Sequence, residues 1–162
     1  MAEEVYDVVD AQDQVVGRAT RETCHRQGLI HRAVHILIFN PRGELLLQER
    51  SQATGTFPGR LTSSASGHVA AGETYEEASR RELLEELGIA VPLERVGFVR
   101  SHDPVHMQNI TVFRGIAEGP FTKEDASVEK LTFLPLEQVR QWVRATPDKF
   151  TPACRAVVAL LG

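Results

Sequence analysis

Three glutamates near the middle of the chain have the spacing of a metal-binding group. Glu82, Glu85 and Glu86 stand three and four positions apart, so in a helix they share one arc of its surface. Like charges at this spacing repel, and each pair costs a helix about 0.2 to 0.5 kcal/mol when no cation is present. Clustered glutamates on a helix are usually a hydrated surface, but the repulsive spacing here favours a divalent-metal site. Oxygen-only ligands suit Mg²⁺ or Mn²⁺, which keep positions open for phosphate oxygens and water.

The residues around the glutamates predict the helix that carries them. Thr74 and Glu77 form a capping box, in which the hydroxyl accepts from a first-turn amide while the carboxylate reaches back to the Thr74 amide. Gly88 can adopt the left-handed conformation that ends a helix. We therefore expect a helix from Thr74 to Leu87. Its packed face, opposite the glutamates, should consist of Leu83, Leu84 and Leu87.

The segment over residues 67–89, GHVAAGETYEEASRRELLEELGI, has the complete residue pattern of a Nudix box, and the chain resembles the Nudix hydrolases. The resemblance implies a loop–helix–loop that holds divalent ions against a diphosphate while water attacks phosphorus. It makes Glu82, Glu85 and Glu86 the metal-facing carboxylates and Gly67 a ligand through its backbone carbonyl. The implied cofactor is Mg²⁺, with Mn²⁺ as a substitute.

Two further residues of the box have roles that the resemblance implies. Arg81 would be catalytic by orienting a glutamate through an ion pair, and Glu77 and Glu85 both lie four residues from it, within helical reach. Glu73 would stabilise the loop that enters the helix. The alternative for Arg81 is an ordinary surface salt bridge.

Outside the box, the segments over residues 8–51 and 57–68 resemble the Nudix branch related to isopentenyl-diphosphate isomerase. His31 and His68 match metal-ligand histidines of the isomerases, and His25 lies near a third. A lone histidine is more often a satisfied polar group than a ligand, so the residues by themselves favour a structural role for this cluster.

Two positions in this branch argue against isomerase activity. The isomerases use a cysteine before the Gly-His pair and a glutamate on the strand after the box to move protons on carbon. This chain has Ser66 and Gln108 there. A serine hydroxyl without an activating base is a poor acid, and an amide does not titrate near neutral pH. We therefore do not expect isomerisation.

Candidate substrate contacts and the general base come from less specific signals. The substrate-binding candidates, which would contact phosphate oxygens, are Arg32, Arg50, Arg60 and His68. Many Nudix proteins place a further glutamate before the valine that opens the last strand, where this chain has Ser127. The base is therefore open among Glu82, Glu124, Asp125 and Glu129, and His102 or Asp103 could approach on a loop.

The order of elements predicts an α/β (α+β) fold with a mixed sheet between helices, in agreement with the Nudix α/β/α sandwich that the resemblance implies. The 162 residues suit a single domain over residues 1–162, with an N-terminal hairpin and helix extension over residues 1–30. We expect strands over 5–9, 15–19, 31–39, 44–50, 61–66, 93–101, 107–117 and 130–134. Helices are expected over 20–27, 74–87, 136–145 and 151–161.

Composition narrows the classes of partner. A net charge of -4 without a basic cluster argues against a nucleic-acid polymer as partner. The two cysteines, Cys24 and Cys154, are expected to be reduced and buried. No signal peptide or membrane span is visible, so we expect a cytoplasmic protein without a membrane partner. The sequence gives no signal for an oligomer.

The leading hypothesis is Mg²⁺-dependent hydrolysis of a diphosphate or triphosphate linkage in nucleoside di- or triphosphates, giving a monophosphate product. The substrate would be a small-molecule nucleotide or other diphosphate. One alternative is isopentenyl-diphosphate isomerase, which Ser66 and Gln108 disfavour. The other is a non-catalytic nucleotide-binding sensor, against which the intact box argues.

Overall fold

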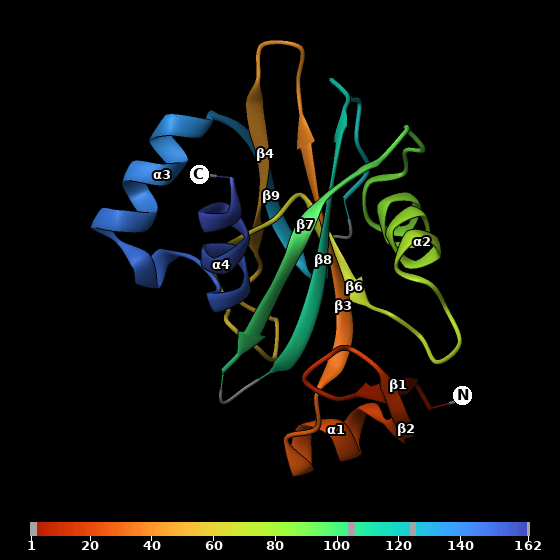
Figure 1. Cartoon of the computed structure of the whole chain (residues 1–162). Coiled ribbons are helices and arrows are strands. Elements are labelled where there is room, and N and C mark those ends of the chain that lie inside the picture. The colour runs from red at the N-terminus through yellow and green to blue at the C-terminus, as the bar shows by residue number, and fades with distance from the viewer. Residues whose placement is uncertain (1–2, 104–105, 124–125, 162) are drawn as a thin grey trace.

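A mixed sheet with helices on both faces forms the centre of the computed structural model, which describes residues 3–103, 106–123 and 126–161 (Figure 1). The central strand is β3 (His31–Phe39). It pairs in parallel with β8 (Met107–Ile116) and antiparallel with β6 (Ala65–His68), and β8 also pairs with β7 (Glu94–His102). On the other side, β4 (Glu44–Arg50) pairs with β5 (Leu61–Thr62) and β9 (Val128–Pro135). The predicted α/β/α sandwich is confirmed.

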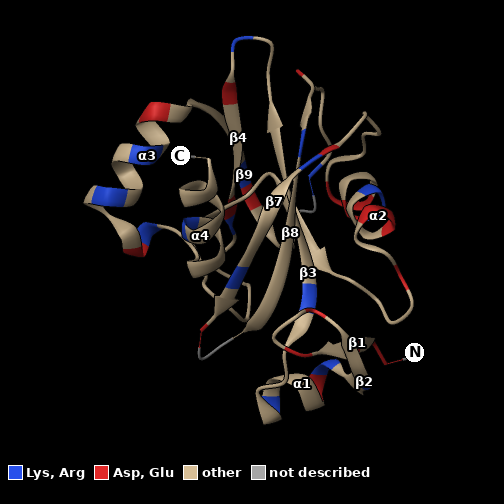
Figure 2. Ribbon diagram, viewed as in Figure 1, with Lys and Arg blue, Asp and Glu red and all other residues tan. Residues whose placement is uncertain are grey.

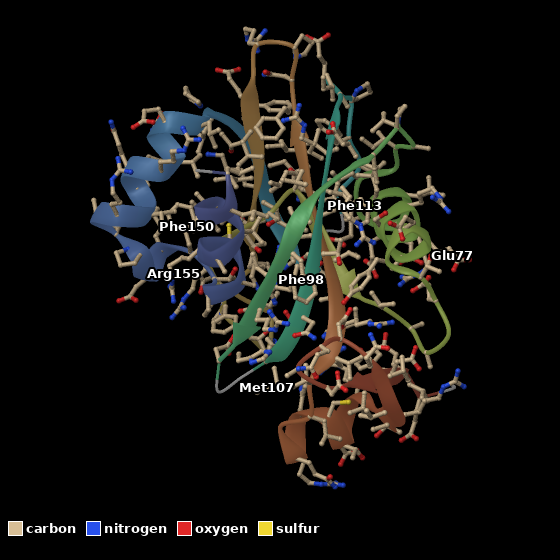
Figure 3. All side chains as sticks on the ribbon, in the orientation of Figure 1. Glu77, Phe98, Met107, Phe113, Phe150 and Arg155 are labelled. Carbon is tan, nitrogen blue, oxygen red and sulfur yellow. The ribbon has the colours of Figure 1, made fainter. Side chains whose placement is uncertain are left out.

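Side chains of β3 alternate between two cores, because successive residues of a strand point to opposite faces. Ala33 and Leu37 pack with the helices α3 (Leu136–Ala145) and α4 (Pro152–Leu160). Val34, Ile36 and Ile38 pack under α2 (Tyr75–Leu87). Figure 3 shows Phe150 on the α4 side of the sheet and Phe113 on the α2 side. The box helix and the C-terminal helices therefore cover opposite faces.

The strand expected over residues 61–66 is divided, which corrects the sequence prediction. β5 ends at Thr62 and β6 begins at Ala65, with Ser63 and Ser64 between them. The Ser64 hydroxyl accepts a hydrogen bond from the Ile38 amide at 2.8 Å and donates one to the Leu46 carbonyl at 2.6 Å. β3 and β4 are in register only where Phe39 faces Leu45, so this buried serine bridges the two strands where they separate.

The N-terminal extension lies against the end of β3 that begins at His31 (Figure 1). It consists of β1 (Val5–Val9), β2 (Val15–Thr20) and α1 (Arg21–Gln27). The Thr20 hydroxyl caps α1, and Gly28 ends it with a φ of 65°. This arrangement brings α1 beside the first residue of β3.

Other element boundaries agree with the sequence to within two residues, and a short 3-10 helix over Pro147–Lys149 was not expected. One packing prediction is wrong: Leu84 is 58% exposed, whereas Leu83 and Leu87 are buried. Leu84 lies about 100° around the helix from Leu83, beyond the strip that contacts the sheet. Cys24 and Cys154 are free and buried, as predicted.

Within the described part of the chain, no helix has the length and apolar character needed to cross a membrane.

Candidate active site

The capping box and the C-terminal glycine of α2 form as the sequence predicts. Thr74 Oγ1 accepts from the Glu77 amide at 3.0 Å, and the Thr74 amide donates to Glu77 Oε1 at 2.9 Å. Gly88 ends the helix with a φ of 70°. The two ends of the helix are thereby fixed, and the red ribbon segments of α2 in Figure 2 mark its acidic residues.

Two of the three box glutamates turn inward toward β6, and the third faces solvent. The Glu82 side chain is 14% exposed and that of Glu85 is 59% exposed. Glu86 is partly buried and accepts hydrogen bonds from the Ser66 amide at 3.1 Å and from Gln48 Nε2 at 3.4 Å. The Glu82 carboxylate fills the space above Gly67, where a Cβ atom would collide with it. A side chain at position 67 would therefore displace the Glu82 carboxylate from its place against β6.

Burial makes the two inward carboxylates hold a proton. Loss of hydration, followed by the hydrogen bond and negative charge of Glu82, raises the pKa of Glu86 to about 9. Loss of hydration also raises the pKa of Glu82, although Arg81 opposes this effect. Two partly buried carboxylates that share one proton offer only oxygen ligands, and one of their negative charges is not neutralised by that proton. This set fits a hard divalent cation.

Arg81 connects the box helix to the loop before it. Its Nε and Nη2 atoms contact the two carboxylate oxygens of Glu73 at 2.8 and 2.9 Å, and Nη2 also donates to the His68 carbonyl at 3.0 Å. Nη1 lies 2.7 Å from Glu82 and 3.3 Å from Glu85. The expected pair with Glu85 is present. Glu77, the other glutamate within helical reach, is bonded instead to the Thr74 amide in the capping box.

Four histidines meet on the other side of Gly67. His25 of α1, His31 of β3, His68 of β6 and His106, which precedes β8, have ligand-type atoms within 4.8 Å of one another. The first three were predicted from the sequence to lie near one another, whereas His106 was not. Nothing local marks His106, since it reaches the cluster only through the pairing of β8 with β3.

The histidine cluster is held in its neutral form. Burial, followed by the charges of neighbouring imidazoles and Arg21, lowers the pKa of His68, and similar causes lower the pKa of His106 to about 4. His31 Nδ1 donates to the Leu29 carbonyl at 3.0 Å, which leaves the lone pair on Nε2. In the described part of the chain, the buried atoms His31 Nε2 and His106 Nδ1 have no hydrogen-bond partner. Orphaned imidazole nitrogens that converge on one point fit a transition-metal ion.

A cavity of about 200 Å³ is lined by His68 and His106 of the histidine cluster and by Ser66 and Gly67, which contact the two inward carboxylates. Its lining comprises Arg21, Ala33, His35, Arg50, Thr56, Phe57, Thr62, Ser66, Gly67, His68, His106, Gln108, Thr151 and Ala153. Arg50 is held there by the Thr56 carbonyl at 2.9 Å and the Thr56 hydroxyl at 3.1 Å. Gln108 Nε2 lies 3.3 Å from His68 Nε2. The cavity wall thus contains two of the predicted phosphate contacts, Arg50 and His68, together with Ser66 and Gln108.

The structure separates the three predicted arginines. Arg50 lines the cavity, and the Arg60 guanidinium lies 5.0 Å from the ring centroid of Phe57, which is a wall residue. Arg32 is 3.2 Å from Asp13 of the N-terminal hairpin and lies 5.2 Å over the Tyr75 ring. Its contacts therefore connect the hairpin to the start of α2.

The candidate bases are also separated. Glu82 lies at the box, and Glu129 is exposed on β9. Glu124 and Asp125 fall outside the described residues. The sequence analysis assigned no role to Arg21, His35 or Gln48, which the fold brings to this region from α1, β3 and β4.

Comparison with known proteins agrees with this geometry. A family model for the NUDIX domain matches residues 29–154. The chain is 34% identical over 155 residues to a prenyl-diphosphate phosphatase from Methanosarcina mazei, covering 91% of this chain and 88% of the relative. It is 34% identical over 155 residues to the uncharacterized Nudix hydrolase YfcD of Escherichia coli, covering 95% and 84%.

A solved structure supports the fold independently. DR0079 from Deinococcus radiodurans superimposes with a TM-score of 0.83 at 24% identity, covering 96% of this chain and 98% of that one. The family model spans most of the sequence, and the box helix is present with two of its carboxylates turned toward β6. The chain therefore belongs to the Nudix hydrolases, which cleave diphosphate linkages.

Proposed function

We propose that the protein hydrolyses nucleoside di- or triphosphates at a diphosphate linkage, with Mg²⁺ as cofactor and a monophosphate as product. The observation that carries this proposal is the pair of inward-facing carboxylates, Glu82 and Glu86, which lie against Ser66 and Gly67 in the wall of a cavity that also contains Arg50. Without a cation the pair retains a proton, whereas a bound dication would compensate both charges.

Four ligands would hold the metal: Glu82, Glu86, Glu85 and the carbonyl of Gly67. When bound, the divalent ion supplies charge for the diphosphate and lowers the pKa of an attacking water. The chain's own residues fix this donor set. Arg81 holds Glu82, while the Ser66 amide and Gln48 hold Glu86. Arg50 is placed to contact phosphate oxygens, and Glu82 is the candidate base at the site.

The histidine cluster is proposed as a second metal centre. Its support is the convergence of four imidazoles together with the two buried nitrogens that lack partners. Because burial keeps these imidazoles neutral near pH 7, their lone pairs are free for a metal. His68 would then serve this centre at the boundary of the substrate cavity.

Two classes of substrate, nucleotides and prenyl diphosphates, differ in the organic group attached to the diphosphate. The M. mazei relative makes prenyl diphosphates the competing class. The cavity supports nucleotides instead, since hydroxyl, amide and imidazole groups form much of its lining.

Phosphate release from a panel tests the proposal. The panel contains nucleoside di- and triphosphates, nucleotide sugars and prenyl diphosphates, each with Mg²⁺ and with Mn²⁺. We expect turnover of nucleotides that stops in chelator. Turnover of prenyl diphosphates alone would replace the substrate assignment. Binding of several nucleotides without turnover of any compound would replace hydrolysis by the sensor function.

A further inference from the structure

His35 is a buried imidazole in the wall of the cavity that the mechanism above does not use. It is 4% exposed and stands on β3 directly opposite Ser66 of β6. Its neighbours on the same face of the strand, Ala33 and Leu37, pack in the apolar core beside α4. A histidine here leaves a polar ring where the strand pattern calls for an apolar side chain.

One ring nitrogen of His35 is fixed and the other is free. Nδ1 lies 2.7 Å from Ser63 Oγ, and Ser63 also hydrogen-bonds the thiol of Cys154. Ser63 and Cys154 are fully buried, so this chain of three groups fixes the ring orientation. Within residues 3–103, 106–123 and 126–161, no protein atom hydrogen-bonds Nε2, although His35 lines the cavity. Nε2 is therefore available to a bound molecule.

Charge is distributed unevenly in the cavity. The arginines of the lining are Arg21, which is exposed, and Arg50, which is half-buried. His35 lies in the buried part with Thr62 and Thr151, whose hydroxyls are 3.2 Å apart. Burial lowers the pKa of His35 to about 4, so the ring is uncharged at neutral pH. The exposed part suits phosphate and the buried part suits an uncharged group that forms hydrogen bonds.

We propose that His35 is a specificity-determining residue whose Nε2 hydrogen-bonds an uncharged polar group, such as a base edge or a sugar hydroxyl, on the organic part of the substrate. The inference rests on the proposed diphosphate hydrolysis and defines the substrate class. A hydrocarbon chain in the cavity would leave Nε2 unpaired and dehydrated, which a polar group avoids. The residue thus selects against prenyl diphosphates.

The test compares kcat/KM for ADP and for geranyl diphosphate in wild type, His35→Phe and His35→Gln. Phenylalanine keeps a ring but removes both nitrogens, and glutamine places an amide near the position of Nε2. We expect His35→Phe to reduce the preference for ADP over geranyl diphosphate by at least about tenfold. His35→Gln should recover part of that preference. His102→Phe makes the same change at an exposed residue of β7 and should leave the ratio as in wild type.

Thermal melting and the Mg²⁺ response of each variant establish that it is folded. If His35→Phe does not fold, Ser63→Ala and His35→Gln carry the test, and both must lower the ratio. A ratio within twofold of wild type in the folded variants would overturn the inference. So would a wild-type preference for geranyl diphosphate, although diphosphate hydrolysis would then stand. If wild type cleaves no compound of the wider panel, the proposed function itself fails.

Discussion

Two groups of metal-ligand side chains lie on either side of Gly67, and burial moves their pKa values in opposite directions. It raises those of Glu82 and Glu86 and lowers those of His31, His68 and His106. In both groups burial favours the neutral form. For carboxylates that form carries a proton which a metal must displace, whereas neutral imidazoles are already ligands. Metal binding at the acidic pair should therefore strengthen as pH rises toward 9, while the histidines are available throughout the neutral range.

The same contrast determines how folding stability depends on pH. Between pH 4.5 and about 9 the folded protein holds a proton on Glu86 that the unfolded chain releases, so metal-free stability falls as pH rises. Below pH 6.5 the unfolded chain protonates histidines that the folded protein keeps neutral, so stability falls as pH drops. The two effects oppose each other between pH 4.5 and 6.5, where three histidines outweigh the single Glu86, so the metal-free protein should be most stable near pH 6.5.

The largest expected effect concerns catalysis at the acidic pair. Glu86→Gln should lower the turnover rate by at least about 10²-fold at saturating Mg²⁺, because a metal-facing charge is removed where phosphate charge develops. Glu85→Gln makes the same change on the exposed side of the helix and should cost less than about tenfold. Phosphate release measures both. Near-normal turnover of Glu86→Gln would contradict the metal assignment.

A smaller effect is expected on stability, and it should change sign with Mg²⁺. In chelator, Glu86→Gln should unfold at the same or a higher temperature than wild type, by a few tenths to about 1 kcal/mol, because glutamine needs no proton when it is buried beside Glu82. Raising the pH from 6 to 8 should destabilise wild type more than the variant, since the variant lacks the titrating carboxylate.

Adding Mg²⁺ should reverse the order of the two proteins. Binding to the folded state contributes about 2.7 kcal/mol at a hundredfold excess over Kd, and the variant with a weaker site gains less. Equal Mg²⁺-induced shifts in melting temperature would mean that the carboxylates are only a hydrated surface.

The histidine group should show the opposite pH response. As pH falls from 6.5 toward 4 in chelator, wild type should lose stability by up to about 1.4 kcal/mol per pH unit for each histidine that remains neutral when folded. His106→Gln should reduce this slope by removing one such group. His102→Gln, at an exposed position on β7, serves as the control. Identical slopes for wild type and His106→Gln, measured by denaturant titration, would contradict this view of the cluster.

The sequence predicts what is encoded locally. The capping box and Gly88 follow from spacing within a single helix, and the structure reproduces them, whereas only Glu82 and Glu86 of the three box glutamates turn inward. The prediction that Leu84 packs is wrong because helical periodicity gives the direction of the apolar face but not its width, and the contact with the sheet determines the width.

Residues from distant elements were harder to assign. His106 and His35 join the cluster and the cavity through strand pairing with partners far along the chain, and neither has a flanking motif. Arg32 carries the charge expected of a phosphate contact, but Asp13 of the hairpin lies 3.2 Å from it. The predicted strand over 61–66 was interrupted because Ser64 bonds across two strands that periodicity treats as one hairpin.

The smallest expected effect is the absence of isomerase activity. It depends on Ser66 and Gln108, the cavity residues that contact the acidic pair and the histidine cluster. The Ser66 amide holds Glu86 on the acidic side, and the Gln108 amide contacts His68 on the histidine side. Isomerisation of isopentenyl diphosphate needs one group to give a proton to carbon and another to remove one. A serine hydroxyl without an adjacent base and a carboxamide do neither near neutral pH. When the wild-type protein is incubated with isopentenyl or dimethylallyl diphosphate in deuterated water, neither compound should therefore gain deuterium at carbon. The double variant Ser66→Cys with Gln108→Glu would place both missing groups at the cavity. Protein-dependent exchange in wild type would show that another pair, with His35 as the nearest candidate across from Ser66, performs the proton transfers.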